Sequence, residues 1–206
     1  CSGHGPMVAS WAGGPFIPMP MDSVCVFCGS RNGDDPAYVE AARATGTAIA
    51  NRGWRLVYGG GNIGLMGALA DAAVEAGGEV IGVIPRALLD REVVNPHVTR
   101  THVVTSMHRR KALMSNLADG FLTLPGGFGT LEEFFETLTW AQLGLHRKPC
   151  ALLDVIGFWQ PLISMLSASA NDGFVTRTHL ELILTGTEID DLLDRMAGYQ
   201  APENAH

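Results

Sequence analysis

The sequence predicts a single α/β domain with a doubly wound, Rossmann-like parallel sheet that helices cover on both faces. Short apolar runs of strand length alternate with longer segments of helical periodicity from residue 23 to residue 196. The connections between successive strands are also long enough to hold a helix. Strands joined by helical crossovers run parallel, and a sheet of that kind is buried on both faces.

The predicted strands are the apolar runs that end at glycine, proline or polar residues, and they cover residues 23–28, 54–58, 79–84, 99–104, 121–124, 150–155 and 182–185. The predicted helices place apolar residues three and four positions apart, and they cover residues 36–51, 65–76, 106–119, 131–143, 159–169 and 188–196. In such sheets ligands bind beyond the carboxyl ends of the strands. We therefore expect a functional site among the loops that follow the strands.

The chain has 206 residues, of which 47% are hydrophobic and 17% charged, which is enough for one sizeable core. We expect that core in one domain over residues 21–200. Residues 1–20 are rich in glycine and proline without a period, and we expect a flexible arm there, with Met7, Met19 or Met21 as candidate natural starts. Residues 201–206 would form a tail.

The net charge of −7 argues against a nucleic acid polymer as the main partner, because such interfaces depend on a basic surface. A single nucleotide needs only a local positive site. No apolar run approaches the length of a membrane span, and the first Lys or Arg is Arg31, so the amino terminus lacks the basic start of a secretory signal. We expect a cytoplasmic protein that does not associate with membranes.

Four cysteines could suggest a metal site, but their pattern does not favour one. Cys25 and Cys28 lie three residues apart in an apolar strand, so their side chains point to opposite faces. Cys1 and Cys150 are isolated, and nothing completes a set of four zinc ligands. We expect reduced structural thiols and no metal ion.

The stretch Gly120–Glu133, GFLTLPGGFGTLEE, predicts a buried strand, a glycine-rich turn and the first turn of a helix that starts at Thr130. At such a junction several backbone N–H groups lack partners and the helix dipole is positive, so a phosphate or carboxylate can bind there. The alternative is a tight turn in which Thr130 and Glu133, spaced as T-x-x-E, form a capping box and nothing binds.

Two further stretches contain residues that could contribute to a binding site. Tyr58–Gly67 has the same order of strand, glycine-rich turn and helix, although its glycines fit the dinucleotide-binding fingerprint only loosely. His108–Lys111, HRRK, is the densest basic cluster, and neighbouring residues on a helix diverge by about 100°, so only one or two of these side chains can enter one site. A solvated basic turn is the alternative for this cluster.

These stretches resemble a known family. Pro125–Glu133 is similar to the PGGxGTxxE motif of the LOG (Lonely Guy) family, the cytokinin riboside 5′-monophosphate phosphoribohydrolases, which are often labelled "possible lysine decarboxylase". Met107–Lys111 matches a second motif of the family, MHxRK, and the glycine loop at Tyr58–Gly67 matches too. The similarity runs from about residue 23 to about residue 186.

The resemblance implies hydrolysis of the N-glycosidic bond of an adenosine 5′-monophosphate, N6-substituted or plain, to free base and ribose 5-phosphate. It implies that Glu133 is the catalytic carboxylate and that Arg110 is a catalytic or substrate-orienting residue. It also implies a homodimer, no cofactor, and substrate contacts from Glu92, Lys111, Gly126, Gly127, Gly129, Thr130, Glu132 and Thr139.

Two other functions compete with the hydrolase. A non-catalytic carrier or sensor with the same fold would bind a nucleotide or cofactor, but it would not need Glu133 and Arg110 beside the sugar. A lysine decarboxylase would need pyridoxal phosphate on a lysine. Apart from Lys111 the chain has only Lys148, in a polar turn without a cofactor motif, so we do not expect that activity.

Overall fold

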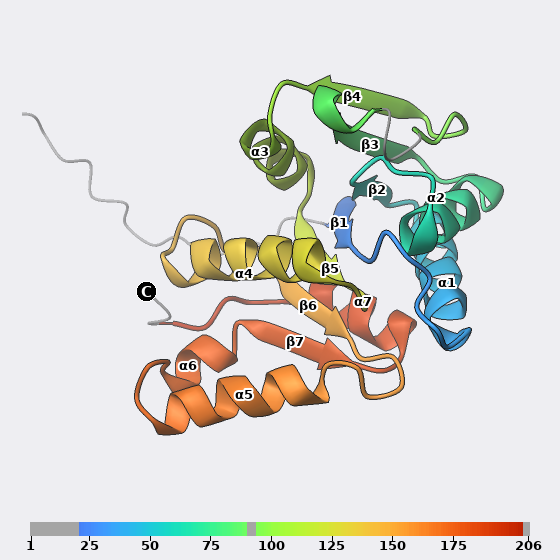
Figure 1. The fold of residues 1–206 in the computed structure, drawn as a ribbon. Helices are drawn as coiled ribbons and strands as arrows, with labels where there is room; N and C mark the ends of the chain where they lie inside the picture. The colour runs from blue at the N-terminus through green and yellow to red at the C-terminus, as the bar shows by residue number, and fades with distance from the viewer. Residues whose placement is uncertain (1–20, 90–93, 204–206) are drawn as a thin grey trace, which may run out of the picture.

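The computed structural model describes residues 21–89 and 94–203. The described chain forms one parallel sheet of seven strands in the order β4-β3-β2-β1-β5-β6-β7 (Figure 1). The strands are β1 Ser23–Phe27, β2 Arg55–Tyr58, β3 Val80–Pro85, β4 Arg100–Val104, β5 Gly120–Thr123, β6 Cys150–Leu153 and β7 Ile183–Gly186. The predicted doubly wound α/β fold is confirmed.

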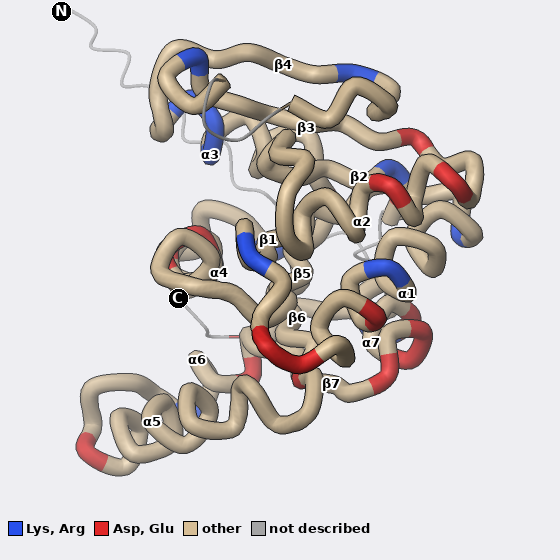
Figure 2. Tube along the Cα trace, turned by 45° about the vertical axis from the view of Figure 1, so that its right-hand side comes forward, with Lys and Arg blue, Asp and Glu red and all other residues tan. Residues whose placement is uncertain are grey.

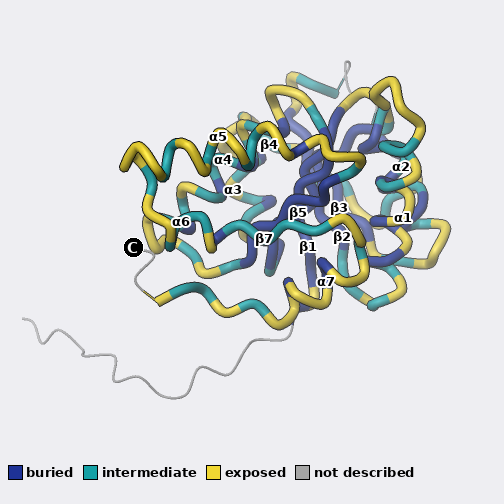
Figure 3. The backbone as a smooth tube through the Cα atoms, turned by 90° about the horizontal axis from the view of Figure 1, so that it is seen from below, coloured by how far each residue is buried: buried dark blue, intermediate teal, exposed yellow. Residues whose placement is uncertain are grey.

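In the described part of the chain, six long helices cover the two faces of the sheet. One face packs against α1 Ala37–Asn51, α2 Gly64–Glu75 and α7 Ile189–Ala197. The other packs against α3 Met107–Leu117, α4 Phe128–Gln142 and α5 Gln160–Asn171. Because strand side chains alternate, Val24 and Val26 enter the first core, whereas Cys25 and Phe27 enter the second. The five inner strands of the described sheet are therefore buried between two helical layers, whereas the edge strands β4 and β7 are less buried (Figure 3).

The strand order reverses at β1. The chain runs outward from β1 through β2 and β3 to β4, and then returns to place β5 on the other side of β1. Val24 lies opposite Gly120 and Phe27 opposite Thr123, so β1 and β5 end together at the same edge of the sheet. The amide of Gly29 donates to the carbonyl of Pro125 (3.1 Å) and joins the two loops that follow. This edge is the point of a doubly wound sheet where a ligand is expected.

The ends of the predicted strands and helices differ from the observed ones by at most three residues, and the largest difference is at α4. This helix starts at Phe128 with Gly127 as its N-cap. The alternative interpretation, a capping box between Thr130 and Glu133, is therefore wrong. Two short helices were not predicted, η1 Arg86–Leu88 and α6 Arg177–Leu180. The prediction that Cys25 and Cys28 face opposite sides is confirmed, because they belong to different cores.

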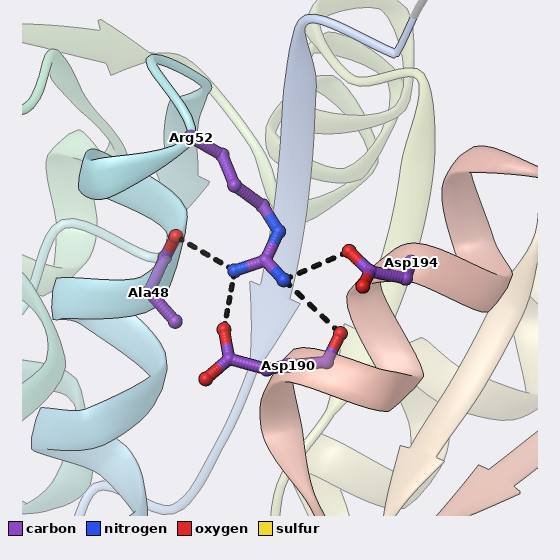
Figure 4. A network of polar contacts seen from close by, with 4 residues as sticks. All are labelled: Ala48, Arg52, Asp190 and Asp194. Atoms are coloured by element: carbon purple, nitrogen blue, oxygen red, sulfur yellow. Dashed lines mark hydrogen bonds and ion pairs between the residues drawn. The ribbon is translucent and has the colours of Figure 1, made fainter.

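A polar network fastens the end of α1 to α7 (Figure 4). The Arg52 guanidinium donates to the carboxylates of Asp190 (2.5 Å) and Asp194 (2.9 Å), and it also donates to the carbonyls of Asp190 (3.1 Å) and Ala48 (3.3 Å). Its side chain lies 5.9 Å from the ring centre of Trp54. A partly buried guanidinium with several acceptors holds two helices in one geometry.

Charge is distributed unevenly over the fold (Figure 2). Acidic positions occur along α2 and α7, whereas α3 contains Arg109, Arg110 and Lys111. Within the described part of the chain, no helix combines the length and the apolar character that crossing a bilayer requires.

Candidate functional site

Two adjoining cavities lie beyond the carboxyl ends of β1 and β5. The smaller, of about 280 Å³, is lined by residues of the loops after β1 and β5 and of α2, η1, α3 and α4: Cys28, Ser30, Met66, Leu88, Met107, Arg110, Gly127, Phe128, Gly129, Thr130, Glu132 and Glu133. The larger, of about 500 Å³, is lined by Gly29, Ser30, Arg31, Asn32, Gly33, Tyr38, Leu65, Pro125, Gly126, Gly127, Phe128 and Phe158. Ser30, Gly127 and Phe128 line both, so together the cavities form one composite site.

The first turn of α4 offers main-chain donors to this site. The first helical hydrogen bond runs from the Leu131 amide to the Gly127 carbonyl (3.0 Å). The amides of Phe128, Gly129 and Thr130 precede it and donate to none of the residues that the structure describes. These groups, with the positive end of the helix dipole, suit an anion such as phosphate.

Gly126 is required at the entrance to this turn. A Cβ atom built on Gly126 would lie 2.2 Å from the Thr130 hydroxyl and 2.9 Å from the amide nitrogen of Gly29. Thr130 is itself buried, so neither neighbour has room to move. The loop before α4 therefore keeps its tight path because residue 126 has no side chain.

The other glycine loop, Tyr58–Gly67, has a different role. The amide of Leu65, in the first turn of α2, donates to the carbonyl of Gly29 (3.1 Å), so a protein acceptor already occupies it. Gly64 has φ +62°, and a Cβ there would lie 2.3 Å from the carbonyl carbon of Ser30. This loop supports the backbone of Gly29–Arg31, and the bond from Leu65 leaves fewer open amides at the start of α2 than at the start of α4.

Arg110 lies in the first turn of α3 and is only 5% exposed. Ser106 caps this helix by accepting from the Arg109 amide (3.2 Å). The Arg110 guanidinium lines the smaller cavity and donates from Nε to the Val83 carbonyl (3.1 Å) and from Nη2 to the Gly59 carbonyl (2.8 Å). These main-chain acceptors, one within β3 and one directly after β2, fix the buried cation in one orientation.

Glu133 reaches the same cavity from α4. It is partly buried and lines the cavity together with Arg110 and Thr130. Burial first, and then the Glu133 carboxylate, raises the pKa of the Cys28 thiol at the end of β1. The two residues expected to be catalytic therefore line one cavity, on different helices.

Lys111 and Glu132 form part of an ion-pair group between α3 and α4. The Lys111 ammonium lies 2.5 Å from a Glu132 carboxylate oxygen and 2.9 Å from one of Glu136. Burial lowers the pKa of Lys111, but its hydrogen bonds to Glu132 and Glu136 outweigh burial, so the net change is upward. Glu132 lines the smaller cavity, whereas Lys111 lines an adjacent narrow hollow with Glu133 and Glu136.

Besides Lys111, which lines only the adjacent hollow, two more of the expected substrate contacts are not brought to this site by the described chain. Thr139 is exposed on α4 and lines a separate cavity of about 120 Å³ with Val175 and His179. Glu92 lies outside the described residues. Among the residues that the structure describes, no cluster of His, Cys, Asp and Glu side chains is arranged to hold a metal ion.

The sequence analysis assigned no site role to a residue of the loop after β1, although this loop lines both cavities. Arg31 is an exposed cation of that loop, and Tyr38 and Phe158 form an aromatic wall with ring centres 5.9 Å apart. The rule that ligands bind beyond strand ends pointed to this loop. No sequence pattern pointed to Phe158. It follows β6, and only the folded chain brings it next to the loop after β1.

Comparison with known proteins connects this site to a family. A family model described as "Possible lysine decarboxylase" matches residues 66–196. The cytokinin riboside 5′-monophosphate phosphoribohydrolase of Rhodococcoides fascians is 46% identical over 186 residues, which are 90% of this chain and 93% of that protein. The cytokinin riboside 5′-monophosphate phosphoribohydrolase LOG of Oryza sativa subsp. japonica is 44% identical over 176 residues, which are 85% of this chain and 73% of that protein.

More distant solved structures share the fold. The molybdenum cofactor carrier protein of Chlamydomonas reinhardtii superposes with a TM-score of 0.64 at 20% identity, covering 87% of this chain and 99% of that one. The molybdenum cofactor binding protein of Rippkaea orientalis gives 0.63 at 22% identity, with 87% and 98% covered. At such identities the likeness extends to the fold alone. The family match and the identities above 40% are decisive: the chain belongs to the LOG family of cytokinin riboside 5′-monophosphate phosphoribohydrolases.

Proposed function

We propose that the protein hydrolyses the N-glycosidic bond of adenosine 5′-monophosphates, with or without an N6 substituent, and releases the free base and ribose 5-phosphate. The observation that carries this proposal is that Glu133, Arg110 and the open amides of α4 line one cavity in a member of a family whose characterised relatives are named for this reaction.

The 5′-phosphate would bind at the first turn of α4. The amides of Phe128, Gly129 and Thr130 point out of the helix end, and unpaired amides at a helix start commonly bind phosphate. The tight path through Gly126 and Gly127 keeps side chains away from that position. The phosphate would thus anchor the nucleotide at a fixed distance from residues further along α4.

Glu133 would act on the sugar. Residue 133 lies one turn and a half beyond the helix start, which is about 7 to 8 Å along the axis and comparable to the span from a 5′-phosphate to the anomeric carbon. Cleavage of the glycosidic bond develops positive charge on the ribose, and a carboxylate beside the anomeric carbon stabilises that charge or takes a proton from water. The water oxygen bonds to C1′, the bond from C1′ to the base nitrogen breaks, and that nitrogen receives a proton.

Arg110 would position the ribose rather than the phosphate. Two sets of its donors are engaged by the carbonyls of Val83 and Gly59, so its orientation is fixed before a ligand binds. A preorganised cation costs little reorganisation during the reaction. Arg110 lines the same cavity as Glu133. From there its guanidinium would donate to ribose hydroxyls and partly compensate the charge of the Glu133 carboxylate.

Neither lysine favours the decarboxylase chemistry in the family's description. The Lys111 ammonium is paired with Glu132 and Glu136, and the Lys148 ammonium donates to the Ser115 carbonyl (2.7 Å). A Schiff base with pyridoxal phosphate needs an accessible lysine in a cofactor pocket. Lys148 lines neither of the two cavities.

We also propose that the protein is a cytosolic homodimer. Residues 133 and 139 are six positions apart on α4, so their side chains differ by about 240° around the helix. The exposed Thr139 would therefore contact a bound nucleotide only from a second copy of the chain. Sedimentation of the purified protein would test the dimer directly.

The hydrolase proposal is tested by incubating the protein with AMP, N6-isopentenyl-AMP and adenosine and quantifying free base and ribose 5-phosphate. Wild type should release base and sugar phosphate in equal amounts from the monophosphates. Glu133→Gln removes the charge at nearly constant size, so kcat should fall about 100-fold or more while the Kd for AMP changes little.

The matched control is Glu181→Gln, the same carboxamide substitution at an exposed glutamate that lines neither of the two cavities. It should keep kcat within about threefold of wild type. Tight binding of AMP without turnover of any nucleotide would favour the carrier, and full activity of Glu133→Gln would remove Glu133 from the mechanism.

A further inference from the structure

The composite site is divided by charge. The charged residues that line the smaller cavity are Arg110, Glu132 and Glu133, so carboxylates outnumber cations there. In the lining of the larger cavity, among described residues, Arg31 is the only charged side chain. A phosphate dianion near Glu132 and Glu133 would be repelled, whereas the same group on the other side of Phe128 would meet a cation.

Arg31 is in place for such a contact. It lies in the loop after β1, whose backbone is joined to the loop before α4 by the hydrogen bond from Gly29 to Pro125 (3.1 Å). The amino-terminal end of α2 holds the same loop, because the Leu65 amide donates to the Gly29 carbonyl (3.1 Å). The Arg31 side chain is exposed, and no ion pair or hydrogen bond joins it to another residue of the described chain.

The negative net charge of the protein makes the Arg31 cation more important for binding an anion. With a net charge of −7, the protein repels a nucleotide at long range, and local cations must overcome that repulsion. The cation of the smaller cavity, Arg110, already donates to two main-chain carbonyls. Tyr38, Leu65 and Phe158 line much of the larger cavity, and apolar walls weaken the competition of water with a charged contact.

We infer that Arg31 is a phosphate-binding residue, which clamps the 5′-phosphate against the amides of α4 from the side of the larger cavity and so selects nucleotides over nucleosides. The inference rests on the proposed function, because it places the ribose of the same nucleotide beside Glu133. Arg31 would hold the phosphate as a fork of N–H donors, while the amides of Phe128, Gly129 and Thr130 bind its other oxygens.

Equilibrium binding by calorimetry tests this inference, with every variant made in the Glu133→Gln protein so that no ligand is consumed. Arg31→Ala should weaken AMP binding about tenfold and leave adenosine binding unchanged, because adenosine has no phosphate. Arg31→Lys should recover part of the loss. The control Arg100→Ala removes an exposed arginine at the amino end of β4, the opposite edge of the sheet, and should change neither ligand's affinity.

The pH dependence separates a phosphate contact from a structural role. The second ionisation of a phosphate ester has a pKa of about 6, so the loss caused by Arg31→Ala should be larger at about pH 8 than at about pH 5. Added salt should also diminish this loss of AMP affinity, because salt screens the attraction between the charges. Unchanged AMP affinity in Arg31→Ala, an equal loss for adenosine, or an equal loss in Arg100→Ala would each overturn the inference.

Failure of the inference can be told from failure of the reaction. If wild type releases base from AMP but Arg31→Ala binds AMP normally, the hydrolase stands and the role of Arg31 falls. If wild type releases no base while AMP binding still depends on Arg31 and on phosphate ionisation, the phosphate clamp stands and the hydrolase falls.

Discussion

Gly59 leaves the space in which the Arg110 guanidinium lies. A Cβ atom on Gly59 would be 2.2 Å from Nη2 of Arg110, closer than any real contact, and the Gly59 carbonyl is one of the acceptors of that guanidinium. Gly126 has the same relation to Thr130. At the residue scale, these glycines therefore make room for a neighbouring side chain.

Replacing Gly59 by alanine should displace Arg110 from both carbonyls. Overpacking of this kind typically costs about 1 to 3 kcal/mol, so we expect the free energy of unfolding to fall by that amount. The value of kcat/KM for AMP should fall at least about tenfold as the cation leaves its position. Urea unfolding and steady-state kinetics measure the two effects.

Gly198→Ala is the matched control, because its Cβ would meet only an ordinary contact, 3.7 Å from the Asp194 carbonyl, at a negative φ. It should change the free energy of unfolding by less than about 0.5 kcal/mol. Wild-type stability and activity in Gly59→Ala would show that Arg110 does not depend on this space.

Single residues were predictable where a local pattern marked them. Arg110 and Glu133 each stand in a short motif on a helix that follows a strand, and both line the cavity. The role of Gly59 was not predictable, because its partner Arg110 is 51 residues away in sequence. Such a contact is set by the sheet order and leaves no mark in the local pattern.

At the scale of elements, α4 shows where local patterns mislead. Its T-x-x-E pattern predicted a start at Thr130, but Gly127 is the N-cap and Thr130 lies within the first turn. The pattern failed because Thr130 packs against Gly126 instead of capping the helix. Periodicity, in contrast, located every long helix and every strand, because it depends on which face is buried.

The segment between α4 and β6 is tied to two helices by a histidine and a lysine. His146 Nε2 lies 2.9 Å from the Thr137 carbonyl, and its Nδ1 accepts the amide of Lys148 (3.1 Å). This pattern requires a neutral ring that donates from Nε2. Burial first, and then the nearby Lys148 charge, lowers the pKa of His146, although its bond to Thr137 raises it in part.

The shift predicts a pH dependence of stability. Because the folded-state pKa of His146 lies below its unfolded value of about 6.5, the unfolded chain binds more protons, and this stability is lost as pH falls from about 6.5 through the folded pKa. Thermal unfolding should show that His146→Gln loses less stability than wild type as pH falls over that range. Glutamine keeps one donor and one acceptor but does not titrate. Identical pH profiles for the two proteins would contradict this assignment.

At the scale of the whole molecule, the strand order brings distant segments to one edge. Because β1 lies between β2 and β5, the loops after β1 and β5 meet, and α3 and α4 add Arg110 and Glu133 from one face. The fold class followed from the alternation of strands and helices. The division of the site into an anionic and a cationic cavity required the three-dimensional structure, since Arg31, Arg110 and Glu133 lie far apart in sequence.

The central claim is that the amides of α4 anchor the phosphate and thereby place the sugar beside residue 133. A crystal structure of Glu133→Gln with bound AMP tests it most directly. We expect phosphate oxygens about 3 Å from the amide nitrogens of Phe128, Gly129 and Thr130, with C1′ next to the residue 133 side chain. A phosphate bound elsewhere, or a C1′ remote from residue 133, would contradict the account.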